Sequence, residues 1–215
     1  MNPQLQKLFS IIYSPDQTRN SESGASSVSG THNLRPQIEN LFKQYNIKSI
    51  FDAGCNDCGW MSQLLNCTSV EYHGGDISLA MVANAWRWHP DLDVQVHDAT
   101  TDPFPKVDLL FVRDVAIHLN NQDKRKLWQN WVASNIPWIL ITHLRQGQDD
   151  IESNLDFDYG STPHFLPFAS VNWEREPWNF PPPMDAVSEY NENNQALGKS
   201  MGLWHQNQLV DILNS

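Results

Sequence analysis

Residues 49–61 read Ser49-Ile50-Phe51-Asp52-Ala53-Gly54-Cys55-Asn56-Asp57-Cys58-Gly59-Trp60-Met61, an apolar run followed by a glycine turn and an amphipathic segment. Ile50 and Phe51 are typical of a short buried parallel strand, and Gly54 allows a tight turn. Apolar residues at 60, 61, 64 and 65 have the spacing of one helix face. The stretch therefore predicts strand, turn and helix, with unpaired N–H groups at the carboxyl edge of the strand. A nucleotide-like ligand binds at that edge in an open α/β sheet.

The rest of the chain repeats this alternation. Further strands are predicted at 71–76, 94–100 and 138–142, and the stretch 107–119 is predicted to be a strand that runs into a polar turn, with Arg113 and Asp114 at the carboxyl end of the strand. Helices are predicted at 1–13, 34–45, 78–86 and 122–134. The segments 186–190 and 201–205 are expected to pair as a closing hairpin. Strands that alternate with helices in this way form a mainly parallel sheet with helices on both faces. The predicted class is therefore α/β, with seven strands and an antiparallel C-terminal hairpin.

The chain divides into two predicted parts. Residues 1–31 are expected to form an N-terminal helix and a Ser/Gly-rich segment, which is either an inert linker or a loop that orders over the ligand. Residues 32–215 are expected to form one domain, with a Pro/Trp-rich loop insertion at about 144–183. The insertion carries Trp173, Trp178 and Phe180, which are expected partly to pack back over the sheet and partly to form a wall of the substrate pocket, with Asn179 and Phe180 nearest the pocket.

Composition narrows the choice of partners. The formal net charge of −11 argues against nucleic acid and anionic membranes, and the basic cluster at 124–126 is expected on a solvated helix face. Three cysteines, at 55, 58 and 67, do not suggest a secreted disulfide scaffold. With no apolar run suited to a signal peptide or a membrane span, the expected location is cytoplasmic. The oligomeric state is left open.

Five short motifs together match the sequence pattern of one protein family. They are Ser-Gly-x-x-Ser from Ser23, Asp-x-Gly-Cys-x-Asp-x-x-Trp-Met from Asp52, Tyr-x-Gly-x-Asp-Ile-Ser from Tyr72, Arg-Asp-x-x-x-His-Leu from Arg113 and a late Trp-Asn-Phe-Pro-x-Pro. On these motifs the chain resembles the class I S-adenosylmethionine-dependent methyltransferases, in a mostly uncharacterised microbial and viral branch. The resemblance runs from about 23 to 204 and implies a Rossmann-like sandwich fold. It also implies S-adenosylmethionine as cofactor and methyl transfer to a small-molecule or glycan-type acceptor.

The resemblance also implies roles for individual residues. Arg113, Asp114 and His118 are the candidate catalytic residues, His118 as general base. Asp76 is expected at the ribose hydroxyls, and Asp98 with Ala99 at the adenine. No metal site is expected. The full set of candidate cofactor-binding residues is Asp52, Gly54, Cys55, Asn56, Trp60, Asp76, Ile77, Asp98 and Ala99.

Other interpretations stay open. Asn56 and Cys58 stand where further glycines are expected, so the chain is alternatively a cofactor-binding but catalytically silent scaffold. An NAD-linked oxidoreductase shares the glycine turn and the second-strand carboxylate but needs the full G-x-G-x-x-G. The Cys55-x-x-Cys58 pair also fits a redox or metal motif. His118 is alternatively a structural residue, and His143 is a second candidate base.

Overall fold

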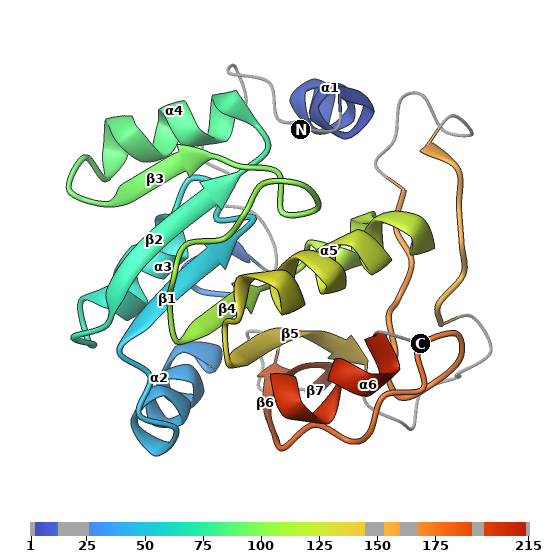
Figure 1. Cartoon of the computed structure of the whole chain (residues 1–215). Coiled ribbons are helices and arrows are strands. Elements are labelled where there is room, and N and C mark those ends of the chain that lie inside the picture. Colours follow the sequence, from blue (N-terminus) through green and yellow to red (C-terminus); the bar gives the residue numbers. More distant parts are fainter. Residues whose placement is uncertain (1–2, 13–25, 145–152, 160–166, 191–195, 214–215) are drawn as a thin grey trace.

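The computed structural model describes residues 3–12, 26–144, 153–159, 167–190 and 196–213. Its centre is a seven-stranded sheet in the order β3-β2-β1-β4-β5-β7-β6 (Figure 1). The strands are β1 (Ser49–Ala53), β2 (Glu71–Asp76), β3 (Asp93–Val96), β4 (Leu109–Val112), β5 (Trp138–Leu144), β6 (Asp185–Tyr190) and β7 (Ala196–His205). Strands β1 to β5 pair in parallel, and β7 runs antiparallel to both β5 and β6. The predicted mainly parallel sheet with its antiparallel hairpin is confirmed.

Helices cover both faces of this sheet. They are α1 (Pro3–Ile12), α2 (Leu34–Gln44), α3 (Gly59–Leu65), α4 (Leu79–Trp88), α5 (Asn121–Ser134) and α6 (Val210–Leu213). Buried side chains of α2, α3 and α4 form one core cluster with the sheet. Those of α1 and α5 belong to a second cluster. None of the described helices is long and apolar enough to span a membrane.

The central strands are apolar on both faces because both faces are covered. In β1, Ile50 belongs to one core cluster and Phe51 to the other, and both side chains are fully buried. Their neighbours Leu109 and Leu110 in β4 divide between the clusters in the same way. Alternation along each strand therefore ties the two layers of helices to one sheet.

The late aromatic segment packs into the core. Trp173, Trp178 and Phe180 are 0%, 3% and 4% exposed. The rings of Trp173 and Phe180 each lie 4.9 Å from the ring of Trp128 in α5, centroid to centroid, in edge-to-face contact. The segment packs back against the core as expected, and this burial removes the large apolar surface of its rings from water. Phe180, predicted nearest the substrate pocket, is not among the residues that line the cavity described below.

The basic cluster at 124–126 is not a uniformly solvated face. Lys124 is fully buried, and its Nζ donates to Asn121 Oδ1 at 3.3 Å. The guanidinium of Arg125 lies 5.3 Å from the ring centroid of Trp178. Arg125 therefore lies over the aromatic segment, whereas the Nζ of Lys124 lies 5.8 Å from the ring centroid of Phe157.

The packing of the aromatic segment predicts a stability effect. Replacing Trp173 by alanine (Trp173→Ala) leaves a cavity against α5 and should lower the free energy of unfolding by about 3–5 kcal/mol. Trp86→Ala, which truncates a tryptophan that is 49% exposed, should cost clearly less. Urea denaturation followed by tryptophan fluorescence measures both. Equal losses in the two variants would contradict the assignment of Trp173 to the core.

Candidate functional site

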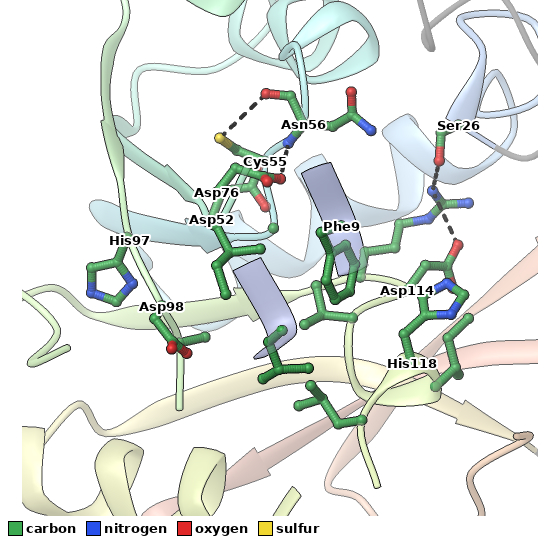
Figure 2. A pocket seen from close by; sticks show the side chains of 18 of the residues that line it. Phe9, Ser26, Asp52, Cys55, Asn56, Asp76, His97, Asp98, Asp114 and His118 are labelled. Carbon is green, nitrogen blue, oxygen red and sulfur yellow. Dashed lines mark hydrogen bonds and ion pairs between the residues drawn. The ribbon is translucent and has the colours of Figure 1, made fainter. Parts of the chain in front are cut away.

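A cavity of about 250 Å³ opens at the carboxyl ends of β1, β2 and β4, where the strand order reverses. It brings together residues that are far apart in the sequence (Figure 2). All twelve candidate cofactor-binding and catalytic residues line it, namely Asp52, Gly54, Cys55, Asn56, Trp60, Asp76, Ile77, Asp98, Ala99, Arg113, Asp114 and His118. The topology therefore gathers the whole predicted set at one place.

The turn after β1 forms despite its two non-glycine positions. Gly54 has φ +83°, and a Cβ there would collide with the side chain of Val115. The N–H groups of Gly54 and Cys55 donate to the carbonyl of Gly75 at 2.7 and 3.1 Å, which fixes the turn to β2. Asn56 and Cys58 adopt left-handed conformations with φ of 55° and 60°. Asparagine tolerates this region, so the departure from glycine does not prevent the turn.

The carboxylate of Asp76 joins this turn to the end of β2. Its Oδ2 accepts the N–H of Asn56 at 2.9 Å, and its Oδ1 accepts the N–H of Ser78 at 2.8 Å. Burial raises the pKa of Asp76 to about 6, although both backbone donors favour its charged form. A carboxylate has about four lone-pair positions, so two are left after these bonds. That capacity is what a pair of ribose hydroxyls needs.

Asp52 lies beneath the turn in a chain of buried hydrogen bonds. The hydroxyl of Tyr72 donates to Asp52 Oδ2 at 3.1 Å and lies 3.3 Å from Cys58 Sγ. Because Tyr72 has a single proton, the thiol of Cys58 is the donor in the second contact. Burial raises the pKa of Asp52 to about 7.

The Cys55-x-x-Cys58 pair does not have the electrostatics of a redox motif. A hydrogen bond with Cys58, together with burial, holds the pKa of the Cys55 thiol well above its ordinary value, and the nearby carboxyls add to the effect. A reactive thiol needs a lowered pKa and a partly exposed, electropositive setting. Both cysteines are free and buried, which favours packing beside the strand.

The loop after β3 supplies Asp98 and Ala99 to the cavity. Asp98 Oδ1 accepts the N–H and the hydroxyl of Thr100 at 2.9 and 2.7 Å. The side-chain amide of Asn130 in α5 donates to the carbonyls of Ala99 and Asp102 at 2.9 and 2.7 Å. The loop is therefore fixed both by its own hydrogen bonds and by α5.

Arg113 and Asp114, at the end of β4, belong to a buried charge network. The guanidinium of Arg113 donates to both carboxylate oxygens of Glu189 in β6, at 3.2 and 2.7 Å, and to Ser26 Oγ at 3.2 Å. Asp114 Oδ2 lies 2.7 Å from Lys199 Nζ in β7 and 3.5 Å from Arg113 Nη1. Burial opposes the charge on Asp114, but Arg113 and Lys199 together hold its pKa below the ordinary value. Asp114 is therefore a carboxylate at neutral pH and a poor base.

His118 has the features of a base in this cavity. Its Nδ1 lies 2.9 Å from the carbonyl of Pro167, which can only accept, so Nδ1 carries the proton. Burial lowers the pKa of His118, so the ring is neutral at neutral pH and Nε2 carries a lone pair.

His143 is excluded as the second candidate base, because it does not line the cavity. It is fully buried, its Nδ1 lies 3.3 Å from the N–H of Trp173, and its Nε2 lies 3.1 Å from Glu174 Oε1. His143 therefore fastens the aromatic segment to β5.

Sequence reasoning missed the part of the cavity that comes from α1. Leu5 and Phe9 line it, and Figure 2 shows Phe9 with Asp52 and Asp76 on one side and Asp114 and His118 on the other. The apolar stripe of this helix predicted docking but not the surface it would cover. Ser26, from the segment expected beside the cofactor, also lines the cavity. Ser23, Gly24 and Ala25 lie outside the described residues.

The cavity suits a nucleotide-like ligand that carries positive charge. The carboxyls of Asp52, Asp57, Asp76, Asp98 and Asp114 line it. Glycine at position 54 lets the side chain of Val115 pack directly on the turn, because a Cβ there would collide with it. Within the described part of the chain, no group of three His, Cys, Asp or Glu side chains is placed to hold a metal ion.

Comparison with known proteins supports the same fold. Residues 50–134 match the family model described as a methyltransferase domain. No curated protein matches the chain in sequence.

Three similar solved structures illustrate the match. Magnesium protoporphyrin IX methyltransferase from Synechocystis PCC 6803 has a TM-score of 0.57 at 13% identity, over 95% of this chain and 94% of that chain. The methyltransferase domain of bacterial-CtHen1-C has a TM-score of 0.57 at 14% identity, over 81% and 97%. The PH0226 protein from Pyrococcus horikoshii OT3 has 0.52 at 20%, over 63% of each chain. At these identities the structures establish the shared fold, as predicted.

The raised carboxyl pKa values predict how stability depends on pH. Between about pH 4 and pH 7 the folded protein keeps protons on Asp52 and Asp76 that the unfolded chain has lost. The free energy of unfolding of the ligand-free protein should therefore contain a term that is present below pH 4 and lost as pH rises to 7. For Asp52 this term is on the order of 4 kcal/mol. Asp52→Asn should flatten the decline and the exposed control Asp91→Asn should not, as measured by urea titrations at pH 5 and pH 8. Identical pH dependence in the two variants would refute the assignment.

Proposed function

We propose that this chain, whose residues 50–134 match a methyltransferase domain, is a class I S-adenosylmethionine-dependent methyltransferase that methylates a small-molecule or glycan-type acceptor. The observation that carries the proposal is the convergence of all twelve candidate residues on one cavity at the switch between β1 and β4. Because the turn forms with Asn56 and Cys58 in place, nothing in its backbone favours a silent scaffold. The NAD-linked oxidoreductase needs the full G-x-G-x-x-G motif, and Asn56 stands where that motif has a glycine, so the turn gives this alternative no support.

We assign the β1 and β2 half of the cavity to the cofactor. Asp76 would accept the ribose hydroxyls, with Ile77 beside it, and Asp98 with Ala99 would border the adenine. The turn from Gly54 to Asn56, with Asp52 and Trp60, would hold the methionine end. The acidic lining supports this assignment, because a cationic sulfonium compound gains from nearby carboxylates.

The β4 half of the cavity would receive the acceptor. The bound cofactor supplies a methyl group as an electrophilic carbon on sulfur, so the chain has to position the acceptor and exclude water. Asp114 is fixed by Thr142 and Lys199. Its carboxylate would orient the methyl acceptor by accepting a hydrogen bond from it. His118 Nε2 would take the proton that the acceptor loses. Arg113 would hold Asp114 in place through their ion pair, and Glu189 in turn fixes the guanidinium of Arg113.

Ligand-dependent thermal stability tests the cofactor assignment directly. S-adenosylhomocysteine and S-adenosylmethionine at about 100 times their dissociation constants should stabilise the protein by roughly 2.7 kcal/mol, or several degrees. NAD at the same concentration should leave the midpoint unchanged. A shift with NAD alone would overturn the assignment in favour of the oxidoreductase.

The role of Asp76 predicts a loss of cofactor affinity. Asp76→Ala removes the acceptor for the ribose hydroxyls and for two backbone N–H groups, so binding of S-adenosylhomocysteine should weaken by more than about 1 kcal/mol. Calorimetric titration of this variant and of the Asp91→Asn control measures the difference. Circular dichroism of both variants confirms that they are folded. Unchanged affinity in a folded Asp76→Ala variant would remove Asp76 from the site.

A further inference from the structure

The charge distribution of the cavity restricts the acceptor. Five carboxyls line the cavity, and among the described residues that line it Arg113 is the single permanent cation. Its guanidinium is engaged by Glu189 through both carboxylate oxygens, by Ser26 and by Asp114. A phosphate or carboxylate on the acceptor would therefore meet like charge without a cation to bind it. The cavity favours an acceptor that is uncharged near its reacting atom.

Two aromatic rings flank the candidate base. The ring centroids of Phe9 and Phe168 each lie 6.2 Å from that of His118. Phe9 comes from α1 and lines the cavity, whereas Phe168 comes from the segment after β5. A flat ring that presents its nucleophile to His118 would contact Phe9 inside the cavity. A part of the acceptor that extends past His118 would reach the exposed ring of Phe168, which is not among the residues that line the cavity.

Phe168 is exposed but held in place. Its side chain is 61% exposed, the largest value among the exposed apolar side chains of the described chain. The residues on either side are both anchored to the 3-10 turn that carries His118. The carbonyl of Pro167 accepts from His118 Nδ1 at 2.9 Å, and the N–H of Ala169 donates to the carbonyl of Ile117 at 2.9 Å. Phe168 therefore presents an exposed ring on a backbone that is fixed to the turn carrying His118.

The basicity of His118 limits the group it can deprotonate. Burial holds the pKa of His118 below its ordinary 6.5, and among its charged neighbours Asp114 raises it while Lys199 lowers it. A phenolic hydroxyl ionises near pH 10, whereas an aliphatic hydroxyl is closer to water at about 15.7. The smaller pKa gap makes proton transfer from a phenol far less costly.

We propose that the acceptor is an uncharged flat ring with a phenolic hydroxyl, which packs against Phe9 and Phe168 and donates to Nε2 of His118. The inference rests on the proposed methyltransferase function and selects the small-molecule acceptor over the glycan. The phenolic oxygen forms a bond to the methyl carbon as the carbon–sulfur bond breaks. The electron pair of that bond stays on sulfur as the sulfonium becomes a thioether, and the phenolic proton moves to His118.

Three probe compounds test the proposal on the full chain saturated with S-adenosylhomocysteine. The probes are 2-naphthol, its carboxylated analogue 6-hydroxy-2-naphthoate, and methyl glucoside. Calorimetric titration should give binding of 2-naphthol at least ten times tighter than that of either other probe. Phe168→Ala should weaken 2-naphthol binding about tenfold, Phe168→Tyr should restore it, and Met184→Ala, which truncates another exposed side chain, should leave it unchanged.

Turnover gives a second measurement. With S-adenosylmethionine and 2-naphthol, His118→Gln should lower the rate of methyl transfer about 100-fold or more while 2-naphthol binding persists. The acceptor proposal is overturned if the carboxylated probe or the glucoside binds as tightly as 2-naphthol, or if Phe168→Ala has no effect. These outcomes are separable from failure of the proposed function, because in that case S-adenosylhomocysteine itself would not bind.

Discussion

The carboxylate of Asp76 is the constraint on which the cavity depends. It accepts one backbone N–H from the turn after β1 and one from the start of α4, so a single side chain fixes two loops. Both loops border the cavity, and their relative position decides whether a nucleotide-like ligand can lie across β1 and β2. Because backbone donors use only part of its capacity, the same carboxylate can hold the loops and bind a ligand.

The opposite half of the cavity is built from long-range contacts. Asp114 has φ 58°, an unusual conformation for a residue that is not glycine. Its N–H donates to Thr142 Oγ1 at 2.8 Å, and its carboxylate accepts a hydrogen bond from Lys199 Nζ. The strained conformation therefore persists because β5 and β7 both hold it. The C-terminal hairpin thus does more than close the sheet, since it fixes the geometry beside the base.

Most of the fold could be predicted from the sequence because its signals are local. The glycine turn, Asp76 and the apolar runs of the parallel strands each lie within a few residues, and the structure confirms their elements. The ring cluster around Trp173 could not be assigned this way, because exposed and buried aromatic loops have the same composition. Only the position of α5 decides that Trp128 covers these rings.

The same limit applies to the candidate site. The carboxyl ends of parallel strands converge by topology, which is why all twelve candidate residues meet at one cavity. Phe9, Phe168, Glu189 and Lys199 escaped prediction because each reaches the site from an element far away in the chain. No local spacing indicates, for example, that a lysine in β7 lies 2.7 Å from the carboxylate of Asp114.

The network of Arg113, Asp114, Glu189 and Lys199 has a consequence for how this protein can evolve. The four formal charges cancel, and the side chains of Arg113 and Glu189 are each only 4% exposed. Losing Arg113 or Glu189 alone leaves a buried charge without its partner, which costs about 3–5 kcal/mol, whereas replacing both by apolar residues can be nearly neutral. A single substitution in this pair therefore lowers the free energy of unfolding. Sequence change at these positions costs less stability when the residue at the end of β4 and its partner in the hairpin change together.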